Sequence, residues 1–191
     1  MSPRLRYTLF GLLCLAQLAV PVSLVVKHED TRRNGSAWRF QTAPVDPADP
    51  FRGRYVRLAF AAERSAVPMA NSGLLYLREG SRLYAELAPD ANGYAQMVRL
   101  HQQRPLTGEY LDVFLRHMNF KEGADRNAPP AAFVRLPFDR YYLPEAQAPE
   151  VERAYNEASR KAQANTWVEV RVLEGHPALV GLVLDGKPVG L

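Results

Sequence analysis

A run of twenty residues without a charge, close to the N-terminus, constrains the fold of this chain more than any other feature. It covers residues 7–26, and a helix of that length spans about 30 Å, the hydrocarbon thickness of a bilayer. Arg4 and Arg6 precede it, so a cleaved secretory signal peptide is the alternative. The run is longer than a typical signal h-region, and no Ala-x-Ala site follows it. We therefore predict a basic flank over residues 1–6 and an uncleaved signal anchor, a single transmembrane helix, over residues 7–26.

The charge pattern argues against nucleic-acid binding. The chain of 191 residues has 24 basic and 20 acidic side chains. Two of the basic residues, Arg4 and Arg6, precede the apolar run, which leaves 22 basic against 20 acidic residues in the rest of the chain. A nucleic-acid interface needs basic residues clustered on one face, and the sequence has no such run. The charges flanking the apolar run are balanced, so the positive-inside rule gives no orientation.

The remaining chain predicts a polar spacer followed by one β-rich domain. Residues 27–36 are polar and have no hydrophobic periodicity, and residues 37–191 form the expected domain. The sole cysteine, Cys14, lies in the apolar run, so the domain has no disulfide. Short alternating segments separated by turn residues are typical of strands. We expect strands at residues 38–41, 55–60, 74–78, 83–87, 94–100, 109–115, 133–136, 168–172 and 178–184, with 74–78 and 83–87 forming a hairpin.

One segment departs from this pattern and predicts an amphipathic helix near residues 149–164. Pro149 suits the first helical position, and Val151, Tyr155 and Ala158 recur at helical spacing. The predicted fold class is therefore mainly β with one amphipathic helix. It is an antiparallel sandwich or a partly closed barrel that follows the N-terminal transmembrane helix.

Two motifs stand out in the domain. The first is PVDPADPFRGRYVRLAF, residues 44–60, in which prolines stiffen the chain before a turn at Gly53 and an alternating strand. It resembles the signature of the GDYXXLXY family of small membrane-anchored proteins. Gly53, Tyr55 and Leu58 occupy the family's letters, whereas Arg54 stands where the family has Asp and Phe60 where it has the final Tyr.

The second motif is FDRYYLPE, residues 138–145, which is similar to an aromatic-rich segment of the same family. With the N-terminal anchor, the likeness covers nearly the whole chain. The resemblance implies a domain exported to the periplasmic side of the cytoplasmic membrane, and it implies no reaction.

The charged and aromatic residues of the two motifs are the candidate site. One interpretation is structural, with Arg–carboxylate pairs that pin residues 44–55 against residues 138–145. The other is a pocket for an anion or a peptide. The candidate residues are Asp46, Asp49, Arg52, Gly53, Tyr55, Arg140, Tyr141, Tyr142 and Glu145.

No motif indicates catalysis, a metal or a cofactor. The four histidines are scattered, with no partner at helical spacing and no cysteine nearby, and no nucleophile or phosphate-loop motif occurs. We expect a non-catalytic, membrane-anchored binding or assembly module of the cell envelope whose partner is a membrane protein. A membrane-anchored hydrolase with an unrecognised active site is the alternative.

Overall fold

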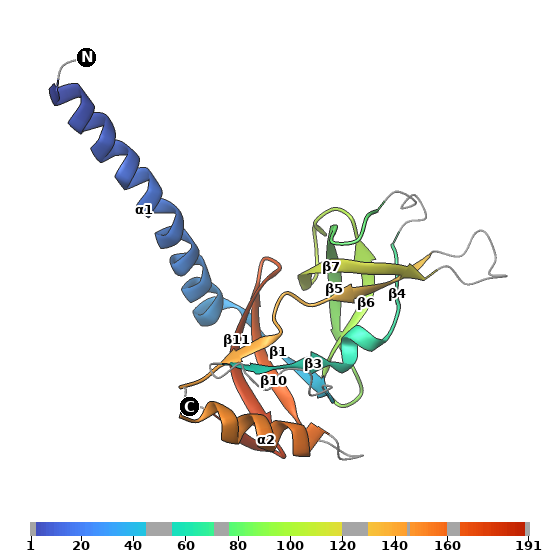
Figure 1. Cartoon of the computed structure of the whole chain (residues 1–191). Helices are drawn as coiled ribbons and strands as arrows, with labels where there is room; N and C mark the ends of the chain where they lie inside the picture. Colours follow the sequence, from blue (N-terminus) through green and yellow to red (C-terminus); the bar gives the residue numbers. More distant parts are fainter. Residues whose placement is uncertain are drawn as a thin grey trace.

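The computed structural model of the chain describes residues 3–44, 55–70, 77–119, 130–144, 146–159 and 165–189. A long N-terminal helix, α1 (Pro3–Asn34), leads into a domain built mostly of antiparallel strands (Figure 1). The predicted mainly β fold is therefore confirmed. Within these residues the domain has two five-stranded sheets, one two-stranded sheet, a second α-helix and the short 3-10 helix η1 (Ala61–Arg64).

The first five-stranded sheet lies next to α1. Its strand order is β12-β11-β10-β1-β3, and every neighbouring pair is antiparallel. In β10, Val168, Val170 and Val172 are buried, as the alternating sequence predicts. The strands are β1 (Ser36–Ala43), β3 (Ala59–Phe60), β10 (Trp167–Leu173), β11 (His176–Leu184) and β12 (Lys187–Val189).

The second five-stranded sheet curls into a nearly closed barrel. Its order is β4-β8-β7-β5-β6. Just after β4, Met69 forms a bridge with Leu100 of β6, and the N–H of Ala70 donates to the Leu100 carbonyl oxygen at 2.8 Å. The first and last strands therefore meet, which fits the predicted partly closed barrel. The strands are β4 (Val67–Pro68), β5 (Arg82–Pro89), β6 (Ala95–His101), β7 (Tyr110–Asn119) and β8 (Ala131–Arg135).

Residues 55–60, the last part of the first motif, contact the second motif. Val56, Leu58 and Phe60 are buried, as the alternation predicts. The segment is nevertheless divided at Leu58, whose N–H donates to the carbonyl oxygen of Asp139 at 2.8 Å. Before the division, β2 (Tyr55–Arg57) pairs with β9 (Arg140–Tyr142), and after it β3 pairs with β1.

The second helix, α2 (Ala148–Ser159), overlaps the segment expected to be helical; residues 160–164 lie outside the described residues. Its buried Tyr155 donates a hydrogen bond to the carbonyl oxygen of Ala43 at 3.0 Å and accepts one from the N–H of Ala59 at 3.3 Å. These bonds tie α2 to the point where β1 and β3 pair.

The helix α1 differs from the expected anchor plus spacer. It does not stop near residue 26 but continues to Asn34, so most of the expected polar spacer is helical. Residues Arg6–Asn34 contain a stretch long and apolar enough to cross a membrane. The last turns of α1 contact β10 and β11, and there Thr31 is buried.

The expected hairpin of residues 74–78 and 83–87 is not the pairing found in the described part of the chain. Leu77 and Arg78 are not in a strand, and residues 74–76 lie outside the described residues. Instead, β5 pairs with β6 and β7. The glycine turn before β5 is closed by the Ser81 N–H, which donates to the Arg78 carbonyl oxygen at 3.0 Å, and it is also bonded to β7, since the N–H of Gly80 donates to the carbonyl oxygen of Leu115 at 2.8 Å.

Candidate functional site

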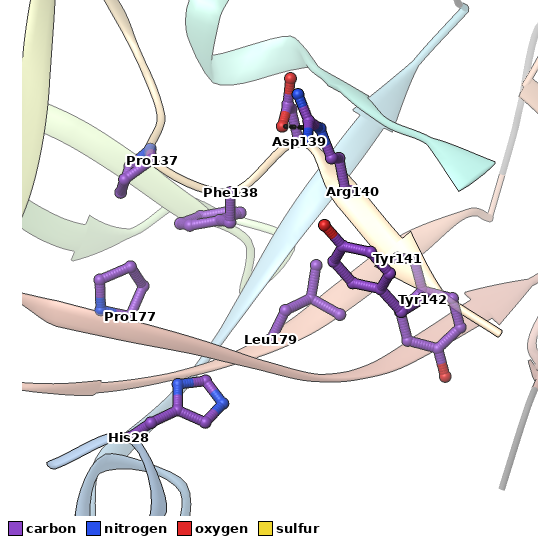
Figure 2. A pocket seen from close by; sticks show the side chains of 9 residues that line it. All are labelled: His28, Pro137, Phe138, Asp139, Arg140, Tyr141, Tyr142, Pro177 and Leu179. Atoms are coloured by element: carbon purple, nitrogen blue, oxygen red, sulfur yellow. Dashed lines mark ion pairs between the residues drawn. The ribbon is translucent and has the colours of Figure 1, made fainter. Parts of the chain in front are cut away.

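A pocket of about 600 Å³ lies where the second motif meets the C-terminal part of α1 (Figure 2). Three parts of the fold form its walls: α1, the segment that leads into and through β9, and the start of β11. The volume lies within the range typical of small-molecule sites. The lining residues are His28, Pro137, Phe138, Asp139, Arg140, Tyr141, Tyr142, Pro177 and Leu179.

The side chains of the second motif point in two directions, into the core and out to solvent. Phe138 is buried and packs edge to face against Phe40 and Phe60, with ring centroids 5.2 Å apart in both pairs. Tyr141 is also buried, and its hydroxyl donates to the carbonyl oxygen of Val189 at 2.9 Å. Burial raises the pKa of Tyr141. Phe138 and Tyr141 therefore hold the motif on the core and on β12.

The outward-facing residues form a small aromatic and charged cluster. The rings of Tyr55 and Tyr142 lie 5.7 Å apart, because their strands pair at these positions. The Arg140 guanidinium carbon lies 5.1 Å from the centroid of the Tyr55 ring, and its Nε is 3.6 Å from Oδ1 of Asp139. The pKa of Arg140 is raised, first by its hydrogen bond with Tyr142 and then by Tyr55 and Asp139. This cluster presents a cation, an anion and two aromatic rings to solvent.

The structure brings together only part of the predicted site. Tyr55 meets Arg140 and Tyr142, and Tyr141 lies beside them in the core. The other predicted residues lie outside the described residues, and they are Asp46, Asp49, Arg52, Gly53 and Glu145.

The ion pair that Arg140 of this set makes with its chain neighbour Asp139 is weak. Arg140 and Asp139 are neighbours in the chain, and their side chains are 50% and 47% exposed. Exposed pairs contribute less than about 1 kcal/mol. Both residues belong to the second motif, so this pair does not itself pin residues 44–55 against residues 138–145.

Sequence reasoning missed the residues that α1 and β11 contribute. The sequence places His28 in the spacer and Leu179 in a strand, and it assigns Pro177 to no element. One signal pointed to a longer helix: Glu29 is three and four residues before Arg32 and Arg33, and it pairs with both, at 2.9 Å and 2.5 Å.

The cluster is suited to binding. Arg140 is a permanent donor, the carboxylate of Asp139 is an acceptor, and His28 adds an imidazole at the other end of the pocket. Among the residues that the structure describes, no three His, Cys, Asp or Glu side chains are grouped so that they could hold a metal ion.

Fold and pocket define a class of protein: a mainly β domain that follows a helix of membrane-spanning length and carries a mixed aromatic and charged pocket beside that helix. The model of the GDYXXLXY family matches residues 17–182, and the chain belongs to this family. Comparison with curated proteins gave no match, and comparison with solved structures gave none either.

Proposed function

We propose that this protein is a non-catalytic binding or assembly module of the cell envelope, anchored by α1. In this proposal α1 is an uncleaved signal anchor that crosses the cytoplasmic membrane once. The β-rich domain lies on the periplasmic side, and a membrane protein beside it is the partner.

One observation carries the proposal: the anchor helix is part of the domain that it anchors. The last turns of α1 pack on β10 and β11, and His28 forms a wall of the pocket. A domain joined in this way is held in one orientation to the membrane, because no flexible linker separates it from the helix. Its pocket then faces the molecules that share its membrane, which is the arrangement a docking module needs.

The exposed face beside the pocket is the proposed contact surface. Tyr142 is 68% exposed and stands next to Arg140. Tyrosine and arginine are enriched in the central contacts of protein interfaces, where they make large and directional contacts.

Site-specific photo-crosslinking of the full-length protein in its native membranes tests the proposal. A photoreactive phenylalanine analogue replaces Tyr142 in one variant and Leu106 in the control. Leu106 is 101% exposed and lies outside the pocket, between β6 and β7. We expect the Tyr142 variant to give a crosslinked product with an integral membrane protein, and the Leu106 variant to give none.

Crosslinks that form equally at both positions, or none at Tyr142 when expression is equal, would contradict the proposed docking face. Carbonate washing of the same membranes tests the anchor, since an uncleaved α1 keeps the protein in the pellet.

A further inference from the structure

We propose that the pocket beside α1 binds the headgroup of a zwitterionic aminophospholipid from the bilayer that α1 spans. Arg140 binds the phosphate, Asp139 accepts from the ammonium group, and the apolar middle of the pocket holds the part of the lipid nearest the acyl chains. This inference rests on the anchoring part of the proposed function and not on the protein partner.

The position of the pocket favours a component of the membrane as its ligand. His28 lines the pocket and lies two residues after the apolar run ends at Val26. At 1.5 Å per residue this places it about 3 Å along the helix from that end. The headgroups of a bilayer occupy this level, because the hydrocarbon core matches the apolar run. The wall that His28 forms therefore stands within the lipid headgroup region.

The polar and apolar groups along the pocket follow the order of the parts of a phospholipid, with charged groups at one end and apolar side chains beside them. Figure 2 shows His28 at the end next to α1 and the Asp139–Arg140 pair at the opposite end, with Phe138 and Leu179 between them. A lipid that enters from the bilayer would place its apolar part along the middle and its headgroup at the charged pair. Tyrosines are common at membrane interfaces for the same reason, since their rings are apolar and their hydroxyls are polar.

The charged pair explains the choice of headgroup. Arginine binds phosphate through two parallel N–H donors. Arg140 also contacts Tyr55 and Tyr142, but its ionic partner, Asp139, is 3.6 Å away and half exposed, so the exchange of that carboxylate for a phosphate costs little. An anionic headgroup would then meet the Asp139 carboxylate with no cation to neutralise it. An ammonium group beside the phosphate supplies that cation, and a primary ammonium donates hydrogen bonds that a quaternary one lacks.

Lipid retention by the purified full-length protein tests this inference. The protein is held in detergent micelles, phosphatidylethanolamine, phosphatidylglycerol or phosphatidylcholine is added, and native mass spectrometry counts the lipids bound to each molecule. We expect phosphatidylethanolamine to be retained best. Arg140→Gln should weaken its binding about tenfold, since it removes a charged hydrogen bond. Asp139→Asn should remove the preference for phosphatidylethanolamine over phosphatidylglycerol.

Arg104→Gln is the matched control. Arg104 also pairs with a carboxylate, Glu174 at 3.8 Å, and also lies over a tyrosine ring, Tyr110 at 5.7 Å, but it is not part of the pocket. This substitution should leave lipid retention unchanged, which separates the pocket from lipids that bind nonspecifically around α1.

Three results would overturn the inference. The first is equal retention of phosphatidylethanolamine by Arg140→Gln and the unaltered protein. The second is a preference for phosphatidylglycerol. The third is equally tight binding of water-soluble glycerophosphoethanolamine, which would make the site one for free phosphate esters. If one of these results were obtained and Tyr142 still crosslinked to a membrane protein, the proposed function would stand and only the lipid site would be ruled out.

Discussion

At the scale of single residues, Gly175 joins the two five-stranded sheets. It lies in the two-residue turn between β10 and β11, at φ +82°, and its carbonyl oxygen accepts a hydrogen bond from the N–H of Asp112 in β7 at 2.9 Å. A Cβ added there would lie 2.6 Å from Oδ1 of Asp112 and 2.6 Å from Cε2 of Tyr110. The turn thus fits against the barrel only without a side chain.

We predict that Gly175→Ala lowers the thermal midpoint of the full-length protein in detergent well beyond the cost of its backbone strain. Gly80→Ala is the matched control, because Gly80 has φ +83° and open space where a Cβ would stand. Positive φ alone costs alanine about 1–2 kcal/mol, which is the loss expected for the control. Equal losses in the two variants would show that the turn is not wedged against the barrel.

Glu63 gives a pH dependence with a definite sign. Burial raises its pKa above the ordinary value of 4.5, while the hydrogen bond from the Leu136 N–H, at 2.7 Å, acts in the opposite direction. The folded protein therefore holds this proton more tightly than the unfolded chain. Its contribution to stability is largest at pH values below 4.5 and declines as pH rises through the folded pKa.

We predict that the unaltered protein gains stability relative to Glu63→Gln as pH falls from 7 towards 4.5. Paired urea titrations at several pH values measure this difference. A difference that is constant across this range, or that changes in the opposite direction, would contradict the raised pKa.

At the scale of elements, the junction of α1 with β10 decides how the domain sits on its helix. Gly35 ends the helix, and its N–H donates to the Thr31 carbonyl oxygen at 2.9 Å. A Cβ at Gly35 would lie 2.5 Å from that oxygen and 2.9 Å from the Val172 nitrogen. Both are backbone atoms of packed elements, so neither can move without separating α1 from β10.

We predict that Gly35→Ala destabilises the protein by about 1–3 kcal/mol, the usual cost of overpacking. It should also expose the last turns of α1 to protease. Gly11→Ala, within the same helix but with nothing within 4 Å of the added Cβ, should cause neither effect. Unchanged protease resistance in Gly35→Ala would mean that α1 and the domain are not packed as described.

The length of an element decides whether the sequence predicts it. Period-two alternation placed long strands such as β7 and β10, because each has enough residues to reveal the pattern. The strands β4, β9 and β12 have only two or three residues each, too few to show a period. The division at Leu58 was invisible for another reason: its two halves keep one alternation while their partner strands change.

The same distinction holds for the candidate site. The motifs pointed to Tyr55 and Arg140, which meet although they are 85 residues apart in sequence. The contributions of His28 and Leu179 depend on how α1 and β11 pack against β9, and no local pattern encodes that packing. The helical turns after Val26 were also not predicted. Their residues are mostly polar or charged, and a polar helix has no hydrophobic periodicity that would distinguish it from a spacer.

At the scale of the whole molecule, α1 and the β-rich domain form one continuous body. The apolar part of α1 is exposed along its length, whereas its last turns are packed against the first sheet (Figure 1). The proposed anchoring places this apolar surface in a bilayer, where a helix satisfies its own backbone hydrogen bonds. The proposed function and the lipid site both depend on which side of that bilayer the domain occupies.

Labelling of single cysteines in intact spheroplasts measures this side directly. In a Cys14→Ser background, which removes the one native thiol, Leu106→Cys places a thiol on the exposed surface of the domain and Pro3→Cys places one at the start of α1. We predict that a membrane-impermeant maleimide labels Leu106→Cys in intact spheroplasts but labels Pro3→Cys only after lysis. Labelling of Pro3→Cys before lysis, with Leu106→Cys protected until lysis, would place the domain in the cytoplasm and contradict the account.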